Sequence, residues 1–128
     1  MKLELEKKVA IITGGSDGIG KAAAMSMSQE GAHVAIAARD QSRLDKAVAD
    51  ISDQTHNPVM GISTDVRDEN SVRALISTVV DQWGGIDILV NNAGTSSTSR
   101  LEDMSNEILT ADIAVSYTHL TLPTIYSV

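Results

Sequence analysis

The sequence predicts an α/β domain built around a parallel sheet, because short apolar runs alternate with segments of helical periodicity. The runs are continuous rather than alternating with polar residues, which is typical of strands buried on both faces of a parallel sheet. The four expected strands are VAIIT (9–13), HVAIAA (33–38), PVMGIST (58–64) and IDILVNN (86–92). Their alternation with helices predicts right-handed crossover connections.

Three helices are expected between these strands. The first spans Gly18 to Glu30, is rich in Ala and Met, and ends at Gly31, a residue suited to a helix C-cap. Apolar residues recur every three or four positions in the other two, which is the spacing of one helix face. These residues are Leu44, Val48 and Ile51 in the second helix, and Val72, Leu75, Ile76, Val79 and Val80 in the third, which stops at Gly84. A weaker pattern begins near Ser105 and fades within a dozen residues.

Composition excludes several classes of protein. A formal net charge of −7 argues against non-specific nucleic-acid binding, which needs a basic face. The chain has no Cys, as expected of a cytoplasmic protein, and its N-terminal apolar run is too short for a signal peptide or a membrane span. His33, His56 and His119 lack the spacing of metal ligands, so no metal site is expected.

A glycine-rich turn, TGGSDGIGKA (13–22), joins the first strand to the first helix. Such a turn exposes backbone N–H groups and the positive end of the helix dipole, a suitable site for phosphate or pyrophosphate. The dinucleotide pattern Gly-x-Gly-x-x-Gly is absent because Ala23 occupies its last position, and the P-loop pattern fails at Ala22, where Ser or Thr would bind magnesium. The pattern that remains is Thr-Gly-x-x-x-Gly-x-Gly, formed by Thr13, Gly14, Gly18 and Gly20. Taken alone, the turn can also be an ordinary strand-to-helix connection.

The same turn, combined with NNAG (91–94) after the fourth strand, resembles the short-chain dehydrogenase/reductase family. The resemblance covers residues 1 to about 113 and is closest to the 3-oxoacyl-carrier-protein reductase and glucose dehydrogenase members. It implies that residues 1–113 form the N-terminal part of a Rossmann-type fold, a doubly wound parallel sheet in a three-layer αβα arrangement. In this chain the fold would be incomplete. It also implies NAD or NADP as cofactor, a small alcohol or carbonyl substrate, and a homotetrameric full-length protein without nucleic-acid or membrane partners.

The resemblance assigns cofactor contacts residue by residue. These residues are Thr13, Gly14, Gly15, Ser16, Asp17, Gly18, Ile19, Gly20, Arg39, Asp65, Val66, Asn92, Ala93 and Gly94. The glycine turn would contact the pyrophosphate and ribose, Asp65 and Val66 the adenine ring, and residues 92–94 the far side of the cofactor. Asn91 would mainly secure the central strand. Asp65 alone can also be read as a turn or capping residue.

The end of the second strand favours NADP, with NAD possible. An acidic residue there would accept the ribose hydroxyls of NAD and repel a 2′-phosphate, whereas this chain has Arg39. Asp17 argues against NADP, since many NADP-using relatives carry a basic residue at that position. Arg39 has a simpler alternative role, which is to pair with Asp40 or Asp45.

The residues that the family uses for catalysis are missing. Relatives use a Ser together with a Tyr-x-x-x-Lys pair, in which the Tyr donates a proton and the Lys lowers its pKa. Here the last lysine is Lys46, Tyr117 is followed four positions later by Thr121, and Tyr126 is near the end of the sequence. We therefore expect no catalytic residues and an inactive fragment of an NADP-dependent short-chain oxidoreductase. The alternatives are a non-catalytic dinucleotide-binding module and, less favoured, a P-loop-like nucleotide binder.

The last sixteen residues, IAVSYTHLTLPTIYSV (113–128), contain no Asp, Glu, Lys or Arg. The resemblance stops at Ile113, and the segment has no helical period. Residues 115–124 can be encoded by a transposase-type sequencing adapter read in frame. We therefore expect 114–128 to be a non-native tail, which leaves an uncovered apolar edge on the fourth strand.

Overall fold

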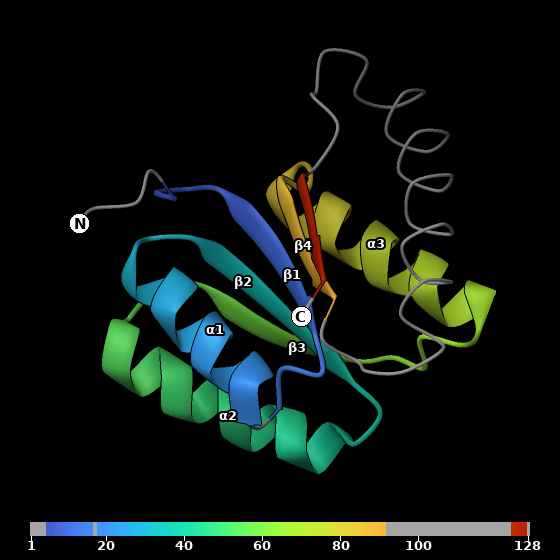
Figure 1. Ribbon diagram of the computed structural model, residues 1–128, viewed down its shortest axis with the longest axis horizontal. Coiled ribbons are helices and arrows are strands. Elements are labelled where there is room, and N and C mark those ends of the chain that lie inside the picture. Colours follow the sequence, from blue (N-terminus) through green and yellow to red (C-terminus); the bar gives the residue numbers. More distant parts are fainter. Residues whose placement is uncertain (1–4, 17, 92–123, 128) are drawn as a thin grey trace.

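A five-stranded parallel sheet forms the centre of the molecule and carries helices on both faces (Figure 1). The computed structural model describes residues 5–16, 18–91 and 124–127. The elements in chain order are β1 (Val9–Thr13), α1 (Gly18–Gln29), β2 (His33–Ala38), α2 (Gln41–Thr55), β3 (Val59–Ser63), α3 (Glu69–Trp83), β4 (Ile88–Asn91) and β5 (Thr124–Ser127). The predicted α/β class and the order of the first seven elements are confirmed.

Alternate residues of the central strands supply two separate cores. Ala10 and Ile12 of β1 face α1 and α2, and pack with Leu44 and Ile51 of α2. On the opposite face, Ile11 packs in the cluster that contains the apolar residues of α3. Both faces of β1 are therefore buried, which explains its uninterrupted apolar sequence. The five apolar residues predicted for the third helix are all buried.

The prediction that all four apolar runs are buried on both faces is wrong for β3. Its residues are half-buried or exposed. The reason is its place in the sheet, since β3 lies at the edge and, among the described residues, pairs with β2 alone. Gly61 lets α2 approach closely, because a Cβ there would lie 3.1 Å from side-chain atoms of Leu44 and Val48.

The ends of the helices follow their capping residues. Asp40 caps α2 by accepting hydrogen bonds from the N–H groups of Ser42 and Arg43. Asp68 caps α3 by accepting a hydrogen bond from the N–H of Asn70. The helix ends at Gly84, whose φ of 87° lies in the left-handed region that favours glycine. The stop predicted at Gly84 is confirmed.

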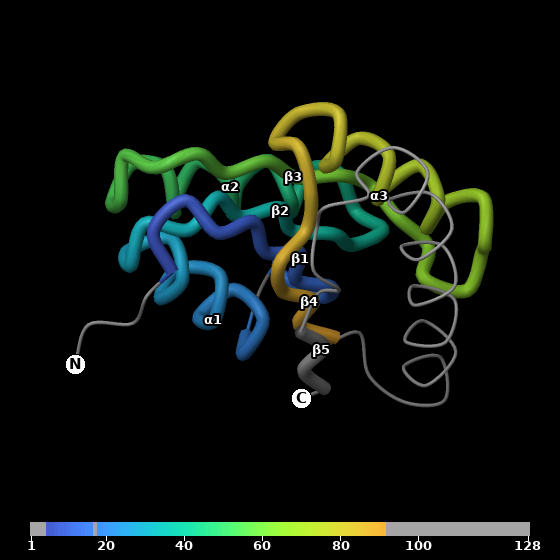
Figure 2. The backbone as a smooth tube through the Cα atoms, turned by 90° about the horizontal axis from the view of Figure 1, so that it is seen from above, coloured from blue at the N-terminus to red at the C-terminus, as the bar shows by residue number. Residues whose placement is uncertain are grey.

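The tail contributes a strand that the sequence analysis does not predict. β5 pairs in parallel with β4, from Ile88 opposite Thr124 to Asn91 opposite Ser127. Figure 2 shows the strands in the order β3, β2, β1, β4 and β5 across the sheet. The expectation of an unpaired β4 edge is therefore wrong, because a β-prone Thr-Ile-Tyr segment satisfies the free N–H and C=O groups of that edge. The weak helical pattern near Ser105 lies outside the described residues.

Within the described ranges, none of the helices combines the length and the apolar character needed to cross a membrane.

Candidate functional site

The carboxyl ends of β1 and β4 meet at the point where the winding of the sheet reverses. From β1 the chain passes through α1 to β2 on one side, whereas β4 lies on the other side of β1. The connections therefore diverge at these two strand ends, and ligands of open α/β sheets bind in the crevice outside such a switch point. The glycine turn begins at this position.

Two buried polar side chains join the strands there. Thr13 and Asn91 are register partners, and both are fully buried. The Thr13 hydroxyl lies 3.1 Å from Oδ1 of Asn91 and donates a hydrogen bond to it. The position of Asn91 agrees with its expected role of securing the central strand. The side chain of Thr13 faces β4, so its assignment to the cofactor would rest on the backbone.

The glycine turn is held against β2. Gly14 has a φ of 67°, and its N–H donates to the carbonyl of Ala37 at 2.7 Å. Gly15 lies so close to the next strand that a Cβ would be 2.7 Å from Cγ2 of Ile36. Gly14 therefore provides the turn in the left-handed region, while Gly15 allows the close approach to β2.

The N-terminal end of α1 leaves space beside Gly18. Gly18 has a φ of 57°, and a Cβ at this position would meet no atom within 4 Å. Ile19 is 68% exposed, although large apolar side chains are otherwise covered among the described residues, and Gly20 is buried. The first turn of the helix contains no acidic residue. Unpaired N–H groups and the helix dipole favour a phosphate at such an end.

The end of β2 carries an exposed cation. Arg39 has no ion pair within the described residues. The carboxylates proposed as its alternative partners are engaged elsewhere, since Asp40 caps α2 and lies 3.8 Å from Arg43, and Asp45 accepts from Gln41. The backbone of Arg39 is fixed by a hydrogen bond that its carbonyl accepts from the hydroxyl of Ser63.

Asp65 lies after the end of β3 and takes part in an ion pair that the sequence analysis missed. Its carboxylate accepts from the backbone N–H of Arg67 at 3.0 Å and from Nε and Nη2 of the Arg67 guanidinium, at 3.1 and 3.3 Å. The side-chain hydrogen bonds from Arg67 are the main cause that lowers the pKa of Asp65, and the charge of Arg39 contributes. The hydrogen bond from the N–H of Arg67 is typical of a turn residue, and the assignment of Asp65 to the adenine ring stays a prediction. Val66 is half-buried against the core on the α3 side.

A basic hollow of about 240 Å³ adjoins the glycine turn, lined by Ser16, Lys21, Arg43, Lys46 and Ala47. Ser16 is among the residues predicted from the sequence, whereas the three cations are not. Arg43 and Lys46 are three positions apart and so share a face of α2, which was the available signal. The packing of α1 against α2 brings Lys21 to the same place.

The sequence comparison decides the family. The family model described as short chain dehydrogenase matches residues 8–124. The chain belongs to the short-chain dehydrogenase family. An uncharacterised oxidoreductase of Staphylococcus epidermidis is 36% identical over 104 residues, which are 81% of this chain and 44% of that relative. This short-chain dehydrogenase sequence thus spans less than half the length of that curated relative.

Solved structures of similar fold agree with the family. The L-sorbose reductase of Gluconobacter frateurii, in complex with NADPH and L-sorbose, is 30% identical with a TM-score of 0.81, covering 91% of this chain and 51% of the reductase. A xylitol dehydrogenase bound to NAD⁺ aligns with a TM-score of 0.82 over 98% of this chain and 54% of the dehydrogenase chain. Its sequence is 21% identical, so this likeness shows the fold alone.

Four of the predicted cofactor residues lie outside the described residues: Asp17, Asn92, Ala93 and Gly94. In the described ranges, no three His, Asp or Glu side chains are grouped in a way that would hold a metal ion.

Proposed function

We propose that this short-chain dehydrogenase chain is the dinucleotide-binding half of an oxidoreductase that interconverts alcohols and carbonyls by hydride transfer with NADP(H). The observation that carries the proposal is the glycine turn that leads into the N-terminus of α1 at the switch point of the sheet. The left-handed Gly14 and Gly18 allow the turn, and space is open at Gly18. This arrangement fits a pyrophosphate, which backbone N–H groups would bind. The dinucleotide, when bound, supplies the hydride.

The preference for NADP rests on Arg39. Its exposed guanidinium follows β2, where an acidic residue would favour NAD. The neighbouring Asp40 directs its carboxylate to the N-terminus of α2 rather than to Arg39. Charge-assisted hydrogen bonds from a guanidinium to a phosphate are strong. The NADPH complex of the similar L-sorbose reductase supports a preference for NADP. The xylitol dehydrogenase of the same fold is bound to NAD⁺, so the fold by itself does not select the cofactor.

The adenine ring would bind between the ends of β2 and β3. Asp65 is held in place by Arg67 and by the Ser71 hydroxyl, which accepts a hydrogen bond from the N–H of Asp65. A fixed, ionised carboxylate is suited to accept a hydrogen bond from the adenine amino group. In this arrangement, the 2′-position of the ribose would lie near the guanidinium of Arg39.

We further propose that the chain has no turnover by itself. Its sequence contains no Tyr-x-x-x-Lys pair, so the proton donor and the lysine that lowers the donor's pKa are both missing. The alternative, a non-catalytic dinucleotide-binding module, makes the same prediction for the isolated chain. The two differ in the source gene, which encodes a Tyr-x-x-x-Lys pair only if the first proposal holds.

Calorimetric titration of the purified chain with NADPH and NADH tests the proposal, with adenosine as a ligand that lacks phosphate. We expect NADPH to bind more tightly than NADH and both to bind more tightly than adenosine. In a kinetic assay with NADPH and a panel of ketones, we expect the absorbance of NADPH to stay constant. The absence of binding by either dinucleotide would overturn the proposed site, and cofactor oxidation that co-purifies with the chain would overturn the proposed inactivity.

A further inference from the structure

Among the described residues, no strand pairs with the outer edge of β3, which lies at one end of the sheet (Figure 2). We propose that this edge is a dimerisation surface, on which β3 of a second copy of the chain pairs antiparallel about a two-fold axis at Gly61. The tail strand β5 lies at the opposite edge of the sheet. The inferred dimer therefore depends neither on the tail nor on the proposed cofactor site.

Every second residue of β3 directs its backbone groups away from β2. The N–H of Thr64 donates to the carbonyl of Ala38 in β2, at 2.8 Å. Because these groups alternate in direction along a strand, the odd-numbered residues of β3 face the outer edge. These residues, the open positions of β3, are Val59, Gly61 and Ser63. Their N–H and C=O groups form no backbone hydrogen bond to another described residue.

The residues of β3 lack the charges and the bulge that usually protect a sheet edge. The segment PVMGIST (58–64) contains no Asp, Glu, Lys or Arg. The register with β2 runs without interruption from Val34 opposite Val59 to Ala38 opposite Ser63, so no bulge bends the strand away. A regular, uncharged edge of this kind is a template for pairing with another strand.

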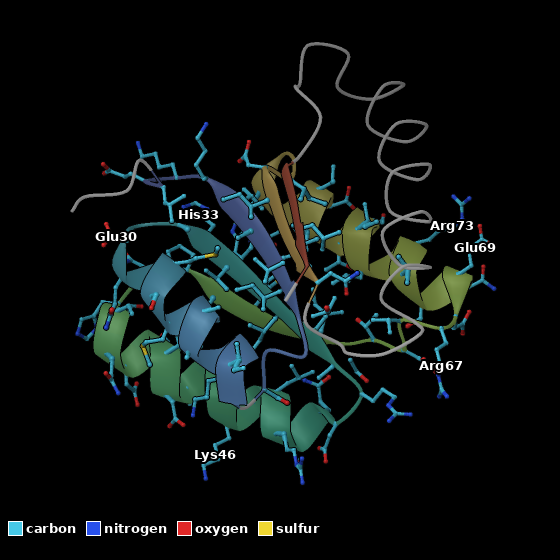
Figure 3. The ribbon with its side chains drawn as sticks, viewed as in Figure 1. Glu30, His33, Lys46, Arg67, Glu69 and Arg73 are labelled. Atoms are coloured by element: carbon cyan, nitrogen blue, oxygen red, sulfur yellow. The ribbon has the colours of Figure 1, made fainter. Side chains whose placement is uncertain are left out.

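Charged side chains of the two helical layers point away from the sheet. Figure 3 shows Lys46 projecting outward from α2, whereas Glu69 and Arg73 project from α3 on the other side. A second strand that approaches β3 in the plane of the sheet would therefore bury none of these three charges. Burial of an unpaired charge is a large cost of association, and the edge of β3 avoids it here.

The open positions of β3 are symmetric about Gly61, which is why a second copy of the chain fits this edge. In an antiparallel pair centred there, Val59 lies opposite Ser63 of the second copy, and Gly61 lies opposite Gly61. Each such pair of residues exchanges two hydrogen bonds, so the three pairs form about six. All open N–H and C=O groups of both strands would then be paired. A register shifted by one residue would instead set open positions opposite residues that already bond to β2.

The same register brings apolar side chains together on the α3 side of the sheet. Met60 and Ile62 are half-buried and pack against the core cluster of that side. In the pair, Met60 lies opposite Ile62 of the second copy, at positions without hydrogen bonds, where side chains are closest. On the other face, Gly61 leaves room for α2, whose Leu44 and Val48 lie over it. Each copy would therefore cover apolar surface that the other leaves half-exposed.

Sedimentation velocity and amide hydrogen exchange test the dimer on the unaltered chain. We expect a weak monomer–dimer equilibrium, because two five-residue strands bury less than the about 1,000 Å² of a stable interface. From about 10 µM to about 1 mM protein, the dimer fraction should rise. Exchange of the Val59, Gly61 and Ser63 amides should slow as it rises. A chain that stays monomeric over this range, or that grows into open-ended assemblies, would overturn the two-fold dimer.

Ser63→Pro removes an open N–H and leaves the hydrogen bonds to β2 in place. Two of the about six bonds between the copies are lost, so the dimer should weaken about 10- to 100-fold. Ser63→Ala is the matched control, since both variants lose the hydroxyl that donates to the carbonyl of Arg39. The alanine variant should dimerise like the unaltered chain. Equal dimerisation of the two variants would contradict pairing through the open N–H.

Cysteine cross-linking tests the register without the proline variant. The chain has no Cys, so Val59→Cys and Ser63→Cys each carry a single thiol. Across the two-fold axis these positions have Cα atoms about 5.5 Å apart, within the range of a disulfide. Position 59 of one copy is about 13 Å further along the strand from position 59 of the other. We expect mild oxidation of an equal mixture to give a mixed disulfide, while each variant alone gives little covalent dimer.

The cross-linking pattern decides between registers. A preference for the mixed disulfide that is lost in urea supports the pairing about Gly61. If Ser63→Cys cross-links to itself as fast as to Val59→Cys, the register is wrong. If the folded mixture gives no mixed disulfide, the inferred dimer is overturned, whatever the chain is found to bind.

Discussion

The hydroxyl of Thr13 donates a hydrogen bond to Oδ1 of Asn91 over 3.1 Å, joining the carboxyl ends of β1 and β4. The two residues are 78 positions apart in the chain and both are fully buried. The bond lies where the crossovers of the sheet diverge, directly before the glycine turn. It therefore fixes the spacing of the two strand ends between which the proposed cofactor site begins.

Thr13→Val should destabilise the chain by about 1–3 kcal/mol, because Val keeps the shape of the side chain but deprives the buried Asn91 of a donor. Urea denaturation followed by circular dichroism measures the change. Thr78→Val is the matched control, since the Thr78 hydroxyl donates to the carbonyl of Ala74 on the exposed side of α3. Its effect should stay within about 0.5 kcal/mol. Equal losses in the two variants would contradict a special role for Thr13.

Arg39→Asp should reverse the preference from NADPH to NADH. Loss of charge-assisted hydrogen bonds to the 2′-phosphate should weaken NADPH binding about 10- to 100-fold, and the new carboxylate can accept the ribose hydroxyls of NADH. Calorimetric titration of both cofactors measures the ratio. Arg73→Asp, which makes the same charge change on α3, should leave the ratio unaltered. Tighter binding of NADH by the unaltered chain would refute the role given to Arg39.

Asp40 should make part of the stability dependent on pH. The Ser42 side chain and the N–H of Arg43 donate hydrogen bonds to its carboxylate, which holds the pKa of Asp40 below its ordinary value of 3.8. A carboxyl whose pKa is lowered by folding contributes stability above its unfolded pKa, and this contribution is lost as the pH falls through its folded pKa. The stability advantage of the wild type over Asp40→Asn should therefore decline as the pH is lowered from about 5 to below 3.8.

Urea denaturation at a series of pH values measures this decline. Asp53→Asn alters an exposed carboxylate of the same helix that has no hydrogen bond to another described residue. Subtracting its pH profile removes the general effect of losing one negative charge. If the stability advantage of the wild type over Asp40→Asn grew as the pH fell, the predicted effect of the Asp40 carboxylate would be contradicted.

The gene in its source DNA should depart from this sequence after about Ile113. There we expect it to continue into a Ser and a Tyr-x-x-x-Lys pair. Amplification and sequencing across this point decide the matter. A natural reading frame that encodes the tail and stops at Val128 would refute the proposal. The pairing of β5 with β4 is neutral on this question, because an open strand edge accepts a β-prone segment whatever its origin.

Local sequence determined much of the fold. The bounds of β1 and β2 and the five buried residues of α3 follow from apolar runs and helical spacing, each contained within a dozen or so residues. The stop of α3 at Gly84 follows from the conformational freedom of one residue. The glycine turn, too, is readable from its spacing, since strand-to-helix turns depend on which residues tolerate a left-handed backbone.

Tertiary structure decided the relationships that cross between elements. The half-buried state of β3 depends on its place at the sheet edge, and the contact between Thr13 and Asn91 depends on strand register. The hollow with Lys21, Arg43 and Lys46 exists only because α1 packs against α2 on one face. Even the pairing of Asp65 with Arg67 needs the turn after β3. Local propensity acts through neighbours in the chain, whereas these contacts join residues whose distance is set by how the sheet and helices pack together.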